Sequence, residues 1–379
     1  MTIFRRVAFA ALLAFAASIA RAEGEKRPLN YRKRPKTEAS EAQPAGKIPR
    51  LLGGRWLPQI DDAVSRLVAV RGSSAAAYDE QTPPAAALSL DGAQYVVGDP
   101  AEAVFRKLVV QAEFRFSDDF WKQVPRGYGR QKIRAAYEQF SVQPKEVWPH
   151  LPTYRQFVKF FLASYLDTCN RVGRKECRSY LAKLVIGFTD EELRDYAKVA
   201  LDEEALEKPR FDVYGEFDGD PEATKWRRGL APLPELPALV KVLRNAGFDV
   251  WGVSSSAQGI ADEAADRAGI DPTRAIGIKQ SLDRGKNTGD LREPIPVRAG
   301  EVDAVVHSLG RAPIFALGAR PEDLELLEYA PELRVYVDWG WKEAEVRALK
   351  MNALVQPPFE TVPPPAKPVK ARKKKSRAR

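Results

Sequence analysis

The sequence predicts an α/β protein with a Rossmann-like parallel sheet core and an inserted, mostly helical cap domain. Apolar segments typical of buried strands recur along the chain, and a helical pattern follows each of them. Strands that alternate with helices favour a parallel sheet. A long stretch of mainly helical pattern separates the first of these strands from the second. A helical insertion into the sheet core explains both observations and leaves a cleft between core and cap.

The first predicted strand covers residues 85–90. The turn residues Asp91 and Gly92 follow it, and a helix is expected to begin near Asp99. The second strand, 247–253, ends in three serines, Ser254, Ser255 and Ser256, which are expected to cap the next helix.

The third predicted strand covers 313–317 and ends in Gly318, before a leucine-rich helix. The inserted segment has helical patterns at 154–169, 176–186 and 190–206. In open parallel sheets, ligands bind at the carboxyl ends of the strands. Residues 89–93, 254–256 and 318–323 are therefore expected to converge and to hold the chemistry.

Composition narrows the possible classes. The chain has 379 residues, of which 44% are hydrophobic and 29% charged, which excludes a wholly disordered, fibrous or polytopic membrane protein. Two histidines and two cysteines leave little material for a zinc cluster.

Changes in composition along the chain set the predicted domain boundaries. They are a signal peptide at 1–22, a disordered basic linker at 23–50, an α/β core at 51–100 and 225–355, a helical cap at 101–224, and a disordered tail rich in Pro, Lys and Arg at 356–379.

The N-terminus has the features of a secretory signal. Arg5 and Arg6 precede an apolar stretch too short to span a bilayer, and Ala20-Arg21-Ala22 fits a signal peptidase site. We therefore expect a secreted protein, periplasmic in a Gram-negative bacterium, with no transmembrane helix after cleavage. Cys169 and Cys177 flank a predicted helical turn, and in an oxidising compartment they are expected to form a structural disulfide.

The net charge of +9 is concentrated at the two ends. The last fourteen residues, 366–379, hold eight Lys or Arg and no acidic residue, whereas the body at 51–365 is acidic overall. Such a tail suits anionic cell-envelope polymers or lipid headgroups. No motif points to specific nucleic-acid binding.

Four segments in the expected order resemble the haloacid dehalogenase-like superfamily, within it the phosphoserine phosphatase-like group, and more narrowly secreted phosphatases of the phosphorylcholine phosphatase kind. The matching segments are residues 86–93, 248–256, 300–305 and 313–324, and the stretch from Gly187 to Leu193 looks like the family's cap segment.

The resemblance implies an aspartyl nucleophile, a second Asp as general acid and base, a phosphate-binding Ser or Thr and Lys, and Asp residues that position Mg²⁺. This chain departs from that pattern. Ser89 stands at the nucleophile position, Ala93 replaces the Thr, Glu301 stands at the Lys position, and Ala319 and Arg320 replace a metal-binding Asp and its following Ser. Asp91 keeps the second carboxylate, and Asp323 keeps a possible outer metal ligand.

These losses predict a pseudo-phosphatase that binds an unknown ligand or partner through the cleft, the cap or its basic ends. No cofactor is expected, or Mg²⁺ if the protein is active. The alternatives are a phosphomonoester hydrolase with residual or altered activity that relies on Asp91, and a structural envelope protein.

The surviving residues also have plainer interpretations. Asp91 suits a turn and Ser254 a helix cap, although Ser254 and Ser255 could bind an anion. Arg320 could replace the missing Lys charge or lie in solvent. The aromatic side chains Phe157, Phe160, Phe161 and Tyr165 have helical spacing and are expected to pack inside the cap, although they would also suit a cationic ligand.

Overall fold

The computed structural model describes residues 50–116, 120–124 and 129–359. A seven-stranded sheet forms its core, with the strand order β11-β10-β9-β1-β6-β7-β8. Neighbouring strands are parallel except β7 and β8. The strands are β1 (Ala85–Ser89), β6 (Asp249–Ala257), β7 (Ala275–Asp283), β8 (Lys286–Arg292), β9 (Phe315–Gly318), β10 (Leu333–Val337) and β11 (Leu354–Gln356).

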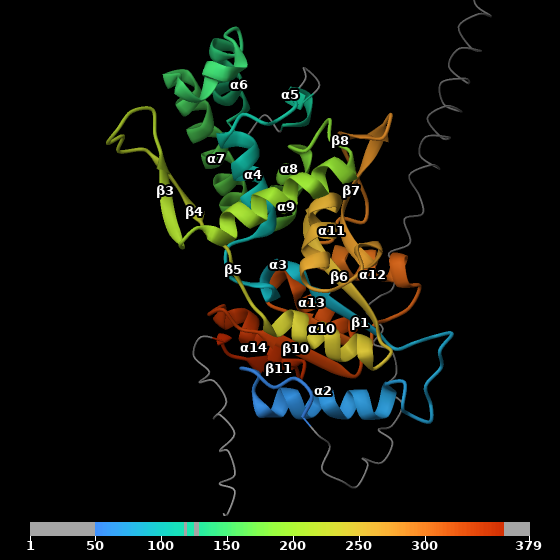
Figure 1. The fold of residues 1–379 in the computed structure, drawn as a ribbon. Helices are drawn as coiled ribbons and strands as arrows, with labels where there is room; N and C mark the ends of the chain where they lie inside the picture. Colours follow the sequence, from blue (N-terminus) through green and yellow to red (C-terminus); the bar gives the residue numbers. More distant parts are fainter. Residues whose placement is uncertain (1–49, 117–119, 125–128, 360–379) are drawn as a thin grey trace, which may run out of the picture. The chain divides into compact units, whose positions relative to one another are not determined.

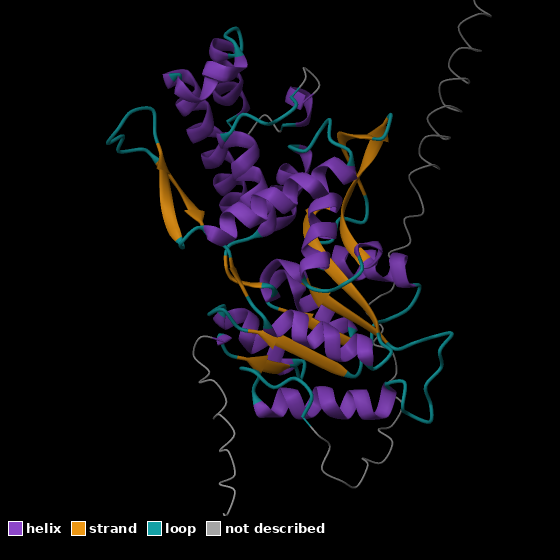
Figure 2. Cartoon of the chain, in the orientation of Figure 1, coloured by secondary structure: helices purple, strands orange, loops and turns teal. Residues whose placement is uncertain are grey.

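Helices cover both faces of this sheet (Figures 1 and 2). Successive side chains of β1 point to opposite faces, so Ala86 and Leu88 join one hydrophobic cluster and Ala87 joins another. The first cluster includes α2 (Pro58–Arg71), α10 (Glu235–Asn245) and α11 (Gln258–Arg267), and the second includes α12 (Ala299–Leu309), α13 (Leu324–Tyr329) and α14 (Lys342–Lys350). The predicted α/β class with a mostly parallel sheet is confirmed.

The segment between β1 and β6 is mostly helical. It contains α3 (Leu90–Ala93), β2 (Tyr95–Val97), α4 (Pro100–Val110), α5 (Phe120–Gln123), α6 (Arg130–Phe140), α7 (Pro152–Arg171), α8 (Arg174–Lys183), α9 (Asp190–Leu206), the hairpin β3 (Arg210–Tyr214) and β4 (Thr224–Arg228), and β5 (Ala231–Pro232). Short 3-10 turns lie at Lys145–His150, Pro272–Arg274 and Pro321–Asp323, labelled η1 to η3.

The inserted helices have a core of their own. Phe157 and Phe161 of α7 are fully buried among other rings, and Tyr165 packs against Phe105 of α4. Phe160 is only partly buried, at the edge of the same cluster. The packing interpretation of these aromatic residues therefore fits the structure.

A disulfide joins Cys169 near the end of α7 to Cys177 in α8, as the cysteine pair predicts. The helix break between them lies at Gly173, whose positive φ of 129° is rare for other residues. The bond therefore fastens the first turns of α8 to the end of α7.

Two predicted boundaries differ from the structure. Gln356 ends β11, and Phe359 is buried against the Trp56 ring with centroids 5.0 Å apart, so residues 356–359 belong to the fold and not to the tail. At the other junction, β4 pairs with β3 as far as Arg228, so the inserted segment extends beyond residue 224.

The predicted signal peptide at 1–22, the predicted linker as far as residue 49 and the predicted tail from residue 360 lie outside the described residues. Within the described ranges, no helix is both long and apolar enough to cross a membrane.

Candidate functional site

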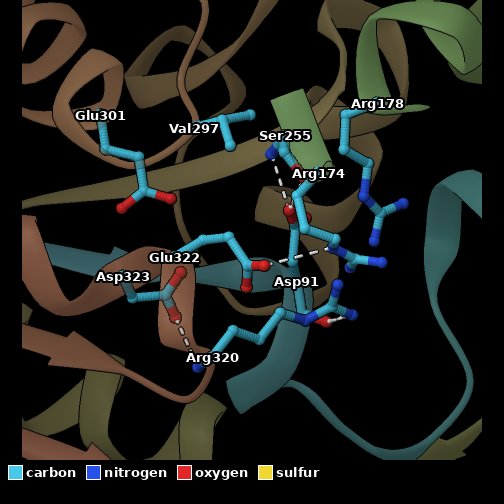
Figure 3. A pocket seen from close by; sticks show the side chains of 9 residues that line it. All are labelled: Asp91, Arg174, Arg178, Ser255, Val297, Glu301, Arg320, Glu322 and Asp323. Carbon is cyan, nitrogen blue, oxygen red and sulfur yellow. Dashed lines mark hydrogen bonds and ion pairs between the residues drawn. The ribbon is translucent and has the colours of Figure 1, made fainter. Parts of the chain in front are cut away.

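A small pocket lies where the sheet reverses its winding direction. The chain runs from β1 to β6 and β7, and then returns to β9 on the other side of β1. Ligand sites of open α/β sheets lie at the carboxyl ends of the strands at such a switch point. The pocket is narrow and partly open to solvent, and nine residues line it (Figure 3): Asp91, Arg174, Arg178, Ser255, Val297, Glu301, Arg320, Glu322 and Asp323.

Asp91 lies just beyond β1 and is buried. The Ser254 hydroxyl donates to its Oδ1 at 2.5 Å, and the Ser255 backbone N–H donates to Oδ2 at 2.7 Å. The Ser255 hydroxyl also donates to Oδ2. Because β1 pairs in parallel with β6 up to Ser89 and Val253, the residues that follow meet at the same edge of the sheet.

The expectation that these serines cap a helix is wrong. Strand β6 continues through them to Ala257, and α11 begins at Gln258 with no side-chain cap. The serine hydroxyls instead donate hydrogen bonds to the Asp91 carboxylate. Asp91 therefore makes more hydrogen bonds than its interpretation as a simple turn residue suggests.

One buried arginine, Arg178, and one partly buried arginine, Arg320, share the carboxylate of Asp99. Arg178 of α8 donates from both terminal nitrogens to Asp99, at 2.9 and 2.5 Å. Arg320, after β9, donates to the same carboxylate at 2.6 Å and to the Asp91 backbone carbonyl at 2.5 Å. Burial acts to raise the pKa of Asp99, but the charges of Arg178 and Arg320 outweigh it and hold that pKa well below its usual range.

A third guanidinium completes the basic side of the pocket. Arg174 precedes Arg178 by four residues on α8, so the two side chains lie on the same face of the helix. Arg174 forms an ion pair with Glu322, with 3.4 Å between Nε and Oε1. Burial and the neighbouring charges of Arg178 and Arg320 lower the pKa of Arg174.

Two carboxyl groups face each other on the acidic side, which Figure 3 shows apart from the guanidinium groups. Burial, followed by the charges of Asp323 and Asp91, raises the pKa of Glu301 well above its ordinary value. Burial raises the pKa of Asp323 to about 6. Both shifts favour the protonated form, as expected for a buried carboxyl beside two others.

Asp323 is already engaged by its surroundings. Its Oδ2 accepts the backbone N–H groups of Ala319 at 2.7 Å and Arg320 at 3.0 Å. The Ser89 hydroxyl also hydrogen-bonds to this carboxyl group. Ser89 thus interacts with an acid in place of a histidine base, and it has no general base of the kind that activates serine nucleophiles.

The residues present do not fit a Mg²⁺ ion. Mg²⁺ prefers carboxylate oxygens in near-octahedral geometry, but the oxygens of Asp91 accept the serine donors and Asp323 accepts two backbone N–H groups. Burial also raises the pKa of Glu301 well above its ordinary value, which disfavours the carboxylate form that would bind the ion. Across the described ranges, no group of three or more His, Cys, Asp or Glu residues is arranged to hold a metal ion.

The Arg320 side chain packs closely against Gly92, in the segment 86–93 that resembles the first motif. A Cβ atom built on Gly92 would lie 3.0 Å from Arg320 Cγ and 3.0 Å from the Ala319 Cβ. Trp339 Nε1 donates to the Gly92 carbonyl at 3.0 Å. The guanidinium of Arg320 is buried in an ion pair, so it does not lie in solvent.

The structure brings most of the predicted site residues together. Asp91, Ser255, Glu301, Arg320 and Asp323 line the pocket. The others support it from behind: Ser254 bonds to Asp91, Ser89 interacts with Asp323, and Ala319 donates its backbone N–H to Asp323.

Sequence analysis missed Arg174, Arg178 and Glu322 as site residues, and it saw Asp99 only as the start of a helix. The four-residue spacing of the two arginines, on either side of Cys177, was the available signal. It places both guanidinium groups on one helix face next to a covalently fixed position.

Comparisons with known proteins support the fold. No family model matches this chain, and no curated protein matches its sequence. Among solved structures, it is similar to a functionally unknown protein from Anaerococcus prevotii DSM 20548, with 21% identity and a TM-score of 0.66, covering 81% of this chain and 93% of that one.

Two further solved structures are more distant. A protein of unknown function from Bordetella pertussis Tohama I has 14% identity and a TM-score of 0.43, with 72% of this chain and 96% of that chain covered. A haloacid dehalogenase family hydrolase from Salmonella enterica serovar Typhi has 13% identity and a TM-score of 0.37, with 70% and 67% covered. The mixed α/β architecture with its mostly parallel sheet is consistent with a Rossmann-like fold.

Proposed function

We propose that this chain is a secreted pseudo-phosphatase of the phosphoserine phosphatase-like group, whose pocket binds a ligand without hydrolysing it. The observation that carries the proposal is the state of the Asp91 carboxylate. Both of its oxygens accept hydrogen bonds from Ser254 or Ser255, and the preceding strand ends in Ser89 with no carboxylate to attack phosphorus. General acid and base catalysis needs a group that can exchange its proton with the substrate.

The basic side of the pocket suggests which part of a ligand would bind. Planar guanidinium groups bind carboxylates and phosphates in a bidentate manner, and Arg174 is held by a longer ion pair than Arg178. A small oxyanion would have to displace Glu322 from Arg174. Replacing Glu322 by Gln should therefore strengthen oxyanion binding.

The experiment combines catalysis with binding. The purified mature protein is assayed for hydrolysis of a generic phosphomonoester with and without Mg²⁺, beside an Asp91→Asn variant prepared in the same way. Inorganic phosphate binding is measured by calorimetry for wild type, Glu322→Gln and Arg174→Met. We expect no turnover above that of the Asp91→Asn protein, tighter phosphate binding by Glu322→Gln and weaker binding by Arg174→Met.

The opposite result favours the alternative function. Mg²⁺-dependent turnover that disappears in Asp91→Asn would mean a working phosphomonoester hydrolase and would overturn the pseudo-phosphatase. If turnover is absent and phosphate binding is the same in all three proteins, the pocket is not an oxyanion site.

We also propose a periplasmic location, supported by the N-terminal sequence and by the disulfide, since disulfides persist in oxidising compartments. The basic tail would then contact anionic envelope polymers or lipid headgroups. Deleting residues 366–379 and measuring envelope association tests this role, and unchanged association would contradict it.

A further inference from the structure

The hairpin β3–β4 has one buried face and one exposed face. Its strands pair so that Phe211 lies opposite Arg227 and Val213 opposite Lys225. Residues directly opposite on paired strands share a face, so these four side chains form one surface. The alternate residues form the other face, where Trp226 is buried in the core of the inserted helices.

The exposed face carries large apolar side chains. Phe211 is 61% exposed and Val213 63%, and Phe217 in the adjoining loop is 58% exposed. The Arg227 guanidinium lies 5.8 Å from the centre of the Phe211 ring. Exposed aromatic and Arg side chains grouped in this way are enriched at protein interfaces.

The rest of the molecule fixes the hairpin loop in position. Lys159 of α7 forms an ion pair with Asp220 at 3.0 Å, and Asp220 also accepts the backbone N–H groups of Glu216 and Glu222. The exposed apolar face is therefore presented by a fastened loop, and it would lose little conformational freedom on binding.

Both outer edges of the hairpin lack a strand partner among the described residues, because β3 and β4 pair with each other alone. An unpaired strand edge presents backbone N–H and C=O groups that another strand can pair with. Backbone pairing of this kind recurs in protein recognition.

The charges of the hairpin are arranged by position along it. The loop end has the exposed acids Asp218 and Glu222, and the opposite end has the exposed bases Lys208 and Arg227. When two such hairpins lie antiparallel, the acidic end of each faces the basic end of the other, and the apolar middles face each other. A twofold axis produces this pattern, since it places the same surface on both sides.

We propose that this hairpin face, defined by Phe211, Val213, Phe217, Lys225 and Arg227, is a docking surface for a second copy of the chain. The two hairpins pack antiparallel about a twofold axis. The acidic loop end of one hairpin is complementary to the basic strand end of another. This complementarity favours a second copy of the chain over an unrelated partner. This interface is independent of the pocket.

The test measures the molar mass of the full mature chain by light scattering over a range of concentrations. We expect a concentration-dependent dimer. Phe211→Ser with Val213→Ser should weaken dimerisation by at least about tenfold, as loss of central apolar contacts does at interfaces. As a matched control, Val142→Ser removes an apolar side chain that is 77% exposed away from the hairpin, and it should leave the dimer unchanged.

A charge exchange makes the test specific. One variant carries Asp218→Lys and Glu222→Lys, and a second carries Lys208→Glu and Arg227→Glu. Each alone places like charges against each other and should stay monomeric, whereas an equimolar mixture should form a mixed dimer because both contacts then pair opposite charges. All these side chains are exposed, and the ion pair that Asp218→Lys breaks, with Arg155, lies at the surface, so circular dichroism should show unchanged folding.

Two outcomes would overturn the proposal. One is a wild-type chain that stays monomeric at every concentration. In that case the role of Lys225 and Arg227 would be to prevent strand edges of two copies from pairing, as basic residues on edges often do. The other is a dimer that none of the hairpin variants weakens, because the interface would then lie elsewhere.

Discussion

The ion pair between Arg178 and Asp99 contributes to stability more than a surface pair would. Arg178 is 1% exposed, and both of its terminal nitrogens donate to Asp99. Removing one partner of a buried pair leaves an uncompensated charge and costs about 3 to 5 kcal/mol, whereas exposed pairs contribute about 0 to 1 kcal/mol.

We therefore expect Arg178→Met to lower the free energy of unfolding by about 3 kcal/mol, measured by urea denaturation. The double variant Arg178→Met with Asp99→Asn should lose no less, because Arg320 is then left without its carboxylate partner. Arg134→Met, which breaks an exposed pair with Glu138, is the control and should change stability little. Equal losses in the two single variants would contradict this account.

The carboxyl group of Asp323 makes stability depend on pH. Its pKa in the folded protein is about 6, above the ordinary 3.8. The folded state therefore holds the proton more tightly than the unfolded chain does, so this contribution to stability is lost as pH rises from about 4 to about 6. Glu301, whose pKa is also raised, acts in the same direction.

The measurement compares urea denaturation of wild type and Asp323→Asn from pH 4 to pH 7. The variant cannot ionise, so the stability of wild type relative to it should fall with rising pH by up to about 3 kcal/mol. Asp195→Asn on the exposed face of α9 is the control, and its curve should run parallel to that of wild type. A constant difference between wild type and Asp323→Asn would show that Asp323 titrates as an ordinary aspartate.

These single residues also mark the limit of sequence-based prediction. Asp91 and Glu301 could be placed at the site because each lies within a segment that resembles a family motif. The role of Asp99 could not be predicted, because it depends on Arg178 and Arg320, which are 79 and 221 positions away in the sequence. Spacing along one element carries no information about such a contact.

At the scale of elements, α8 links the disulfide to the pocket. Cys177 lies between Arg174 and Arg178, and its bond to Cys169 ties this turn of the helix to α7. A bond that closes so short a loop stabilises the folded chain by about 2 to 3 kcal/mol in the chain-entropy description.

We expect Cys169→Ala with Cys177→Ala to lower the free energy of unfolding by about 2 kcal/mol and to raise hydrogen exchange mainly in residues 173–183. Mass spectrometry of exchanged peptides measures the second effect, with strands β1 and β9 as internal references. A reducing agent should reproduce the change in wild type and leave the double variant unaffected. Exchange that rises as much in the sheet as in α8 would argue against local control.

Elements whose pattern is long and periodic were predicted well, and their ends less so. Helix α9 has the bounds that its predicted helical pattern at 190–206 gives, and the structure adds a capping box between Thr189 and Glu192 at its start. Strand β6 was predicted too short, because its serines were taken for helix caps, yet the strand continues to Ala257 to meet Asp91. A partner just beyond the end of the neighbouring strand β1 overrode a local preference, which a single segment cannot reveal.

At the scale of the whole molecule, the parallel sheet and the helical insertion were both predictable, because alternating strands and helices permit few arrangements. The position of the pocket agrees with the expectation that the carboxyl ends of the predicted strands converge. The packing of residues 356–359 could not be predicted in this way, because Phe359 contacts Trp56, which lies near the other end of the sequence.

The export proposal makes a prediction for the full chain. When expressed with its own N-terminus in a Gram-negative host, the protein should be recovered from the periplasm lacking residues 1–22 and with Cys169 and Cys177 oxidised, since Ala20 and Ala22 fit the cleavage pattern. Intact mass measures both changes. Ala22→Leu should block cleavage, and a wild-type protein that keeps residues 1–22 would contradict the proposal.

The contact between Ser89 and Asp323 also sets the cost of placing a carboxylate at the end of β1. Ser89→Asp would add an acid beside Asp323 and Glu301, whose pKa values are already raised. A buried carboxylate without a partner is costly, so this substitution alone should lower stability. The surrounding charges would have to change before a carboxylate nucleophile could be accommodated at this position.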